Sequence, residues 1–172
     1  MNGFTKIDPK ELPGNAISLF ADGWALLTAG TPEDYNTMTI SWGQLGQLWN
    51  LPVCTVFVRP CRYTYEYTEK TGVFTVSLFD KGEYRSQLNL LGTRSGRDID
   101  KMHDSGLTPV QFDGQTAFAE ARAVLVLEKL YNDQFDMAHM PKEILDRNYP
   151  GLPAEQLHRF YFCKITSAYL RK

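Results

Sequence analysis

Apolar residues along the chain either alternate with polar ones or continue unbroken, between short segments rich in Gly, Pro, Asp and Asn. Both patterns are typical of β-strands, half buried in the first case and covered on both faces in the second. The segments with these patterns are Gly23–Ala29, Asn36–Trp42, Val53–Val58, Val73–Phe79, Ala117–Leu130 and Phe160–Leu170. Pro60 ends the third segment, because proline cannot donate to a strand ladder.

Two short helices are predicted between these strands. Thr64 can act as the N-cap of a helix that runs through Lys70. Asp80 and Glu83 form a capping-box-like pair that opens a second helix, in which apolar residues recur at helical spacing. Gly92 is placed to close this second helix.

The rest of the chain adds little further helix. A third short helix is expected over Asp98–Asp104, ending near Gly106, and the proline-containing segment Gln134–Gln156 is an excursion with one or two helical turns. Strands that do not alternate with crossover helices favour an antiparallel sheet. The sequence therefore predicts a mainly β fold with short helices, an antiparallel barrel that forms a single domain over residues 1–172.

The composition is that of a folded globular domain, with 43% hydrophobic and 22% charged residues. A formal net charge of -2 argues against a dedicated nucleic-acid-binding protein, which must neutralise phosphates. The longest apolar runs are far shorter than the ~20 residues of a membrane-spanning helix. Met1–Pro13 also lacks the apolar region of a secretory signal. We therefore expect a cytoplasmic protein with no nucleic-acid or membrane partner.

The first segment with unusual chemistry is Asn36–Gly46 (NTMTISWGQLG). Small polar residues lead to Trp42 and to two glycines that allow close approach of a ligand to the backbone. Backbone amides and the hydroxyls of Thr39 and Ser41 can bond the nitrogens and carbonyls of a flat heteroaromatic ring. The alternative is an ordinary strand and hairpin.

The second segment is Arg59–Thr64 (RPCRYT), which places two guanidiniums and a hydroxyl at the start of a predicted helix. Exposed amides and the helix dipole make such ends anion sites, and arginine adds forked donors that match phosphate oxygens. In the alternative interpretation, both arginines are surface residues paired with Glu66 or Glu69.

The third segment is Gly92–Lys101 (GTRSGRDIDK). Ser95, Gly96 and nearby amides can form a concave nest for an anion, and Arg94, Arg97 and Lys101 add positive charge. The alternative is a capped turn between two helices, in which Asp98 or Asp100 caps the second. Two phosphate-binding candidates, together with one ring-binding candidate, indicate a nucleotide-like ligand.

Other common sites lack support in the sequence. There is no GxGxxG after a strand, no GxxxxGK[ST] loop and no GxSxG elbow. The three histidines and three cysteines do not have the spacing of a metal site. We therefore expect no metal and no dedicated acid–base pair.

Four segments together resemble the flavin reductase-like family that includes flavoredoxin. They are NTMTISWG (Asn36–Gly43), VFVRPCRYTYEY (Val56–Tyr67), FTVSLF (Phe74–Phe79) and NLLGTRSGRDIDK (Asn89–Lys101). The resemblance covers roughly residues 15–130, with a weaker match in LHRFYFCKI (Leu157–Ile165). The order and spacing of the segments make the combination specific.

The resemblance implies a Greek-key-like split β-barrel that forms a homodimer and holds FMN near the subunit interface. It places the isoalloxazine ring along Met38, Thr39, Ser41 and Trp42. It places the phosphate and ribityl chain on Arg59, Arg62, Thr64, Ser95, Gly96, Arg97 and Lys101.

Three functions are compatible with this resemblance: an FMN-dependent NAD(P)H oxidoreductase, an electron carrier reduced by a protein partner, and a flavin-binding module without turnover. Bound FMN would carry the redox chemistry, so no catalytic side chain is assigned. His158 and Tyr161 are interpreted as a surface histidine and a core tyrosine, with a place at the substrate face as the alternative. Cys54 and Cys163 are expected to pack in the core, and Cys61, beside two arginines, is a candidate for a lowered pKa.

Overall fold

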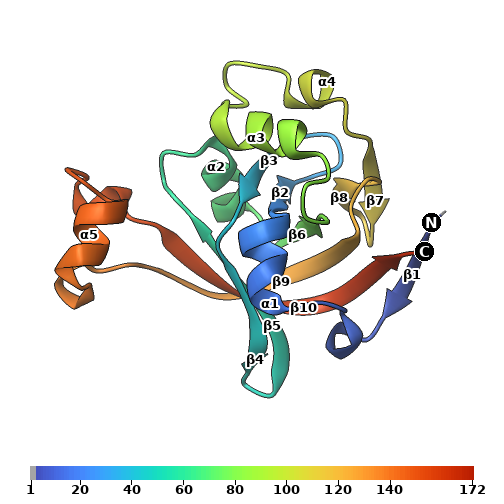
Figure 1. Ribbon diagram of the computed structural model, residues 1–172, viewed down its shortest axis with the longest axis horizontal. Helices are drawn as coiled ribbons and strands as arrows, with labels where there is room; N and C mark the ends of the chain where they lie inside the picture. The colour runs from blue at the N-terminus through green and yellow to red at the C-terminus, as the bar shows by residue number, and fades with distance from the viewer. Residues whose placement is uncertain (1–2) are drawn as a thin grey trace.

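The computed structural model describes residues 3–172 and contains one antiparallel sheet of eight strands (Figure 1). Seven strands follow the order β3-β2-β6-β9-β10-β5-β4, and β1 pairs with β10. Their bounds are β1 (Phe4–Ile7), β2 (Ala25–Gly30), β3 (Tyr35–Ile40), β4 (Gly43–Leu48), β5 (Leu51–Val58), β6 (Val73–Leu78), β9 (Ala123–Gln134) and β10 (Arg159–Arg171). A separate hairpin joins β7 (Pro109–Phe112) to β8 (Gln115–Phe118). All six predicted strands are present, and the fifth, Ala117–Leu130, is divided between β8 and β9.

The sheet curls but does not close into the expected barrel. β3 and β4 lie at opposite ends of the strand order, yet only Ser41 and Trp42 separate them in the chain. Three Cα–Cα steps of about 3.8 Å hold Ile40 and Gly43 within about 11 Å of each other. The two edges therefore face each other at this link. No ladder joins β3 to β4 within residues 3–172, because the link crosses the gap directly and the two strands do not run side by side.

Apolar side chains pack on both faces of the sheet. In β9, Leu125 and Leu127 belong to the cluster inside the curl, which includes Tyr161, whereas Val124 and Val126 belong to a second cluster on the outer face. The outer cluster is covered by α3 (Arg85–Thr93) and the β7–β8 hairpin (Figure 1). Alternating residues of one strand thus serve two cores.

The helices occur near their predicted places, but several predicted helix ends are wrong. α2 (Tyr63–Lys70) begins after Arg62, and the Thr64 hydroxyl accepts a hydrogen bond from Asn36 Nδ2 at 2.6 Å instead of capping the helix. α3 begins after Tyr84, whose φ of 51° is left-handed, so Asp80 and Glu83 form no capping box.

Gly92 does not end α3 but lies in its last turn. A Cβ at this position would lie 3.1 Å from Thr39 Cβ, so the glycine allows the helix to approach β3 closely. α4 (Lys101–Ser105) is shorter than expected, and Asp100 caps it by accepting from the amides of Met102 and His103. Gly106, at φ 66°, ends α4 as predicted.

Two segments near the gap, β4 and the helical segment from Ala16 to Gly23, were not predicted from the sequence. β4 forms a hairpin with β5, and its two-residue turn holds Trp49 and Asn50 at φ 51° and 59°. This left-handed pair is the geometry of a type I′ hairpin turn, which favours residues such as Asn and Gly. α1 (Ala16–Ser18) and the following π-helical turn (Leu19–Gly23) pack beside β4.

Between β9 and β10 the chain makes the expected excursion, which carries α5 (Lys142–Asn148) away from the main body (Figure 1). None of the helices within residues 3–172 is long and apolar enough to cross a membrane. Over the same residues, no group of three or more His, Cys, Asp and Glu side chains could hold a metal ion.

Candidate functional site

A cleft of about 360 Å³ opens where the ends of β3, β5 and the excursion meet. This volume lies within the usual range for small-ligand sites, about 300–1,000 Å³. Its lining residues are Met38, Thr39, Ile40, Ser41, Trp42, Phe57, Arg59, Arg62, Arg147, Asn148 and His158. The structure thus brings together all four residues predicted to bind the ring with two of the predicted arginines.

The exposed edge of β3 supplies backbone groups to this cleft. The Lys101 ammonium donates to the carbonyl of Thr37, so that carbonyl points away from β2. Residues two apart along a strand direct their backbone groups to the same side. The amide and carbonyl of Thr39 therefore also face outward. The Thr39 hydroxyl is already used, because it donates to the carbonyl of Leu88 in α3.

A smaller recess of about 70 Å³ continues from the cleft, and Met38 and Arg62 line both. The other lining residues of the recess are Cys61, Tyr63, Thr64, Thr93, Arg94, Ser95 and Lys101. The recess lies at the N-terminus of α2, whose first amides have no partner within the helix. Hydroxyl, ammonium, guanidinium and amide donors converge there, as at an anion site.

Lys101 has the most unusual environment in the recess. It is 7% exposed, and its ammonium donates to the carbonyls of Thr37 at 2.7 Å and Leu91 at 3.0 Å. Burial and the nearby Arg62 guanidinium lower the pKa of Lys101 to about 8. An ammonium has three donors, so one remains for a ligand in the recess.

Gly96 allows the loop before α4 to close over the recess. A Cβ built on Gly96 would overlap Asn36 Oδ1 and lie 3.1 Å from Tyr63 Cδ1. Asn36 is buried and donates to Thr64 Oγ1, which leaves the Thr64 hydroxyl hydrogen free to reach a ligand. The absence of a side chain at Gly96 therefore lets the backbone of this loop lie close to Asn36 and Tyr63.

Arg97 lies outside both cavities. Its guanidinium is ion-paired with Glu66 and stacks 4.7 Å from the centre of the Tyr63 ring. The surface ion pair considered for Arg59 and Arg62 is thus made by Arg97. Neither Arg59 nor Arg62 forms an ion pair with any residue from 3 to 172.

Arg59 lies in the cleft and not in the recess. Its Nε is buried and has no hydrogen-bond partner among the residues that the structure describes. An unpaired buried donor costs about 1–3 kcal/mol, so this atom is suited to a partner outside the chain.

His158 faces the cleft, contrary to its interpretation as a surface residue. Its ring lies 4.8 Å from that of Trp42, and Nδ1 lies 2.9 Å from the Tyr149 hydroxyl. Burial, with the positive charges of Arg59 and Arg62, lowers the pKa of His158 to about 4, so the ring is neutral near pH 7. Tyr161 is fully buried and hydrogen-bonded to Glu69, as a core residue.

On the other side of Trp42 is an apolar hollow of about 330 Å³. Phe20, Phe57 and Phe135 line it, together with Ile17, which is 76% exposed. Gly43 is tightly packed here, because a Cβ on it would overlap the Phe20 ring. The cleft shares lining residues with the recess on one side and with the hollow on the other, so the three cavities adjoin one another.

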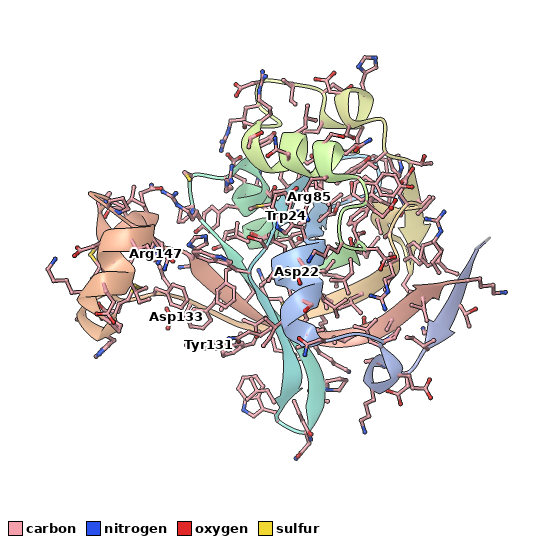
Figure 2. The ribbon with its side chains drawn as sticks, viewed as in Figure 1. Asp22, Trp24, Arg85, Tyr131, Asp133 and Arg147 are labelled. Carbon is pink, nitrogen blue, oxygen red and sulfur yellow. The ribbon has the colours of Figure 1, made fainter. Side chains whose placement is uncertain are left out.

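The sequence did not indicate the residues that reach the cleft from the excursion, namely Arg147, Asn148, Tyr149 and His158. They follow several prolines and show no periodicity that would place them near β3. Figure 2 shows Arg147 on α5, which reaches the cleft only through the fold of this excursion. Cys61 is exposed at the edge of the recess, whereas Cys54 and Cys163 are buried partners across the β5–β10 ladder, as expected of packing residues.

A family model described as "Flavin reductase like domain" matches residues 17–139. No curated protein matches the chain. Among solved structures, an FMN-binding domain of a flavin reductase-like enzyme from Shewanella baltica is similar, with a TM-score of 0.69 and 16% identity over 99% of this chain and 78% of that one.

Two further structures have related folds. A flavoredoxin from Methanosarcina acetivorans has a TM-score of 0.67 and 20% identity over 98% of this chain and 76% of that one. The flavin reductase of styrene monooxygenase from Pseudomonas putida has a TM-score of 0.62 and 21% identity over 89% of this chain and 81% of that one. At these identities, the structural likeness concerns the fold.

Proposed function

The chain belongs to the flavin reductase-like family, and we propose that it binds FMN and uses it to pass electrons from NAD(P)H to an acceptor. The observation that carries this proposal is the continuity of a ring-sized cleft with a phosphate-sized recess. Bound FMN would supply the hydride and electron transfer, and the protein would bind and orient it.

The edge of β3 is the proposed platform for the ring. The outward amide and carbonyl of Thr39, with Ser41 and Trp42 beyond them, would face the polar rim of a flat heterocycle. Backbone amides at this rim would stabilise negative charge on it, because they are fixed by the strand and the bound ring would shield them from water. Met38 lies between the cleft and the recess, where the ribityl chain would pass.

The recess is the proposed phosphate site. Thr64, Ser95 and Lys101 would contact the phosphate directly, Arg62 would contact it from the cleft side, and the first amides of α2 would complete the shell. Gly96 would shape the loop. Arg97 would act at a distance, as a surface cation that holds α2 to this loop through Glu66.

We also propose a homodimer formed through an aromatic face on the outside of β5, β9 and β10. Phe160 and Phe162 alternate along β10 with the buried Tyr161 and Cys163. Stacked or tilted contacts with ring centroids 5.3–6.3 Å apart continue this face. The rings concerned are Phe57, Tyr131, Phe135, Phe160 and Phe162. Tyr131, labelled in Figure 2, is 45% exposed.

The purified protein tests FMN binding directly. We expect flavin absorbance bands and the release by heat of about one FMN per chain. A colourless protein that takes up no added FMN would show that the proposal is wrong.

Rapid mixing with NADH and NADPH separates the oxidoreductase from its two alternatives. Bleaching of the flavin by either nucleotide supports the oxidoreductase. No bleaching by either would favour an electron carrier reduced by a protein partner, or a flavin-binding module without turnover.

A further inference from the structure

Three guanidiniums converge on the cleft without a counter-charge. Arg59 and Arg62 come from the end of β5 and the turn that follows, and Arg147 comes from α5. No Asp or Glu is among the described residues that line the cleft or the recess. Bringing like charges together in a half-enclosed site is unfavourable, and the arrangement is therefore suited to a bound anion.

One anion does not require all three arginines. In the proposed function, the FMN phosphate occupies the recess, where Lys101, Thr64 and Ser95 already provide donors and Arg62 is within reach. Arg59 and Arg147 line only the cleft. They are therefore left without an anionic partner when the recess is filled.

Arg59 supplies the second observation that points to a ligand. Its Nε is buried, lacks a hydrogen-bond partner within residues 3–172, and belongs to a side chain that lines the cleft. Its charge is close enough to influence two neighbours, since it lowers the pKa of His158 and opposes the rise in the pKa of Tyr149.

His158 adds a neutral donor beside this pair. Burial raises the pKa of the Tyr149 hydroxyl, so this group keeps its proton, and we assign it as the donor to His158 Nδ1. Nε2 then carries the hydrogen of the neutral ring. The Trp42 ring, with its centroid 4.8 Å away, also packs against the His158 ring.

We propose that Arg59 and Arg147, with His158, form a second anion site at the open end of the cleft, which binds the carboxylate or phosphate group of the molecule that exchanges electrons with the flavin. This proposal rests on the proposed function, because it assigns the substrate class of that same cleft. It predicts an anionic substrate whose planar part lies against the ring site.

Benzoate and benzamide are suitable probes, because they have similar shapes and differ in charge. Each would be titrated into the FMN-loaded protein, with heat of binding and the change in flavin absorbance as readouts. One or two charge-assisted contacts correspond to an affinity difference of about tenfold or more. We therefore expect benzoate to bind at least about tenfold more tightly than benzamide. Inorganic phosphate added during the benzoate titration should weaken benzoate binding, because both oxyanions would occupy the same site.

Two variants locate the site, and a third is the control. Arg59→Ala and Arg147→Ala should each reduce benzoate affinity, by about tenfold for the half-buried Arg59 and by less for the exposed Arg147, without changing benzamide affinity. Lys142→Ala removes another cation of α5, one that is paired with Asp146 and does not line the cleft. It should leave benzoate binding unchanged.

Failure of this proposal is separable from failure of the proposed function. If the wild-type protein takes up no FMN, the proposed function is wrong. If it binds FMN but binds benzoate and benzamide equally, only the proposal of a second anion site is wrong. Loss of both FMN and riboflavin affinity in Arg59→Ala, with an unchanged preference for benzoate, would also overturn it and place Arg59 at the flavin ring.

Discussion

Gly96 lies where the loop of the recess passes over Asn36, the residue that holds Thr64. Replacing it with alanine would bring a methyl group against Asn36 Oδ1 and the Tyr63 ring. The loop must then move away from α2, which opens the proposed phosphate site. We expect Gly96→Ala to weaken FMN binding by about tenfold, the value of one charge-assisted hydrogen bond, and riboflavin binding much less. Quenching of flavin fluorescence on titration measures both.

Gly72→Ala is the matched control, because a Cβ at that position meets nothing within 4 Å and its backbone is not left-handed. Its affinities for both flavins should equal those of the wild type. Unchanged FMN affinity in Gly96→Ala would show that the loop plays no part in the phosphate site.

Because of Lys101, we predict that the affinity for FMN, but not for riboflavin, depends on pH. Its pKa is lowered to about 8 in the protein without ligand, so the ammonium loses its proton as the pH rises through 8. A phosphate in the recess would raise this pKa again, and FMN binding would then take up a proton above pH 8. By linkage, FMN affinity is greatest below pH 8 and falls by up to about tenfold by pH 9.

Titrations with FMN and riboflavin at pH 7, 8 and 9 check this prediction. Riboflavin has no phosphate and should show no such fall, and the FMN effect should disappear in Lys101→Met. The same pH profile for both flavins in the wild type would mean that Lys101 does not contact the phosphate.

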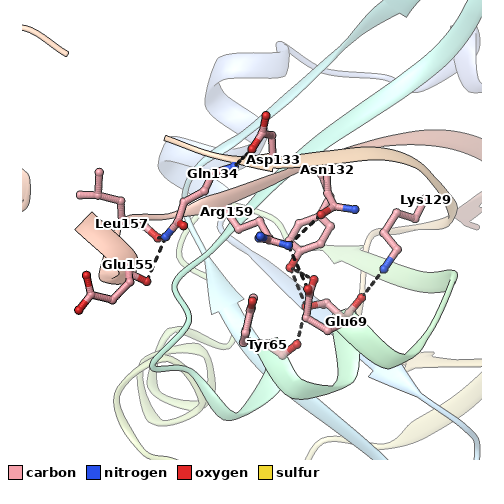
Figure 3. A network of polar contacts seen from close by, with 11 residues as sticks. Tyr65, Glu69, Lys129, Asn132, Asp133, Gln134, Glu155, Leu157 and Arg159 are labelled. Carbon is pink, nitrogen blue, oxygen red and sulfur yellow. Dashed lines mark hydrogen bonds and ion pairs between the residues drawn. The ribbon is translucent and has the colours of Figure 1, made fainter. Parts of the chain in front are cut away.

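At the scale of elements, α2 is held to the sheet by a polar network at its C-terminal end (Figure 3). Glu69 accepts from Tyr161 at 2.8 Å through Oε1 and from Arg159 at 3.0 Å through Oε2. Arg159 also donates to Asn132, and Lys129 donates to the carbonyl of Thr68. These contacts fix the helix whose other end forms the recess.

Glu69→Ala leaves the buried Tyr161 hydroxyl without its acceptor. The expected cost is about 1–3 kcal/mol in the free energy of unfolding, measured by urea denaturation. Glu66→Ala, on the same helix, removes an exposed ion pair with Arg97 and should cost about 0–1 kcal/mol. Equal losses in the two variants would contradict the anchoring role of the network.

The sequence predicted the principal strands because their apolar patterns are strong. It also indicated most of the residues that line the recess, because they lie in two compact segments, Arg59–Thr64 and Gly92–Lys101. It misplaced the helix ends where a tertiary contact used the side chain differently. Thr64 is an example, because Asn36, from another strand, bonds the hydroxyl that looked like an N-cap.

The remaining parts of the site depend on contacts between distant segments. His158 and Arg147 reach the cleft only because β9 and β10 carry the excursion to the end of β3, which no local pattern encodes. β4 was missed because its two glycines weaken the strand pattern, although the curl of the sheet depends on its hairpin with β5.

At the scale of the whole molecule, the aromatic face on β5, β9 and β10 should determine the oligomeric state. Phe162→Lys places a charge within this face, beside Tyr131 and Phe160, where burial in a dimer would remove it from water. We expect the wild type to sediment as a dimer and this variant as a folded monomer. Gln111→Lys, on the separate β7–β8 hairpin, is the control and should remain dimeric. A wild-type monomer, or a dimeric Phe162→Lys protein, would contradict the assignment.

The central claim is that the recess binds the phosphate of FMN, and the ratio of riboflavin to FMN dissociation constants tests it most directly. Arg62 lines both the recess and the cleft, so its removal should affect the phosphate first. A charge-assisted hydrogen bond contributes about 1.5–3 kcal/mol, which corresponds to roughly ten- to hundredfold in affinity. We therefore predict that the wild type prefers FMN and that Arg62→Ala weakens FMN binding by this factor while riboflavin binding changes little. Equal weakening of both flavins, or a wild type without preference for FMN, would contradict the account.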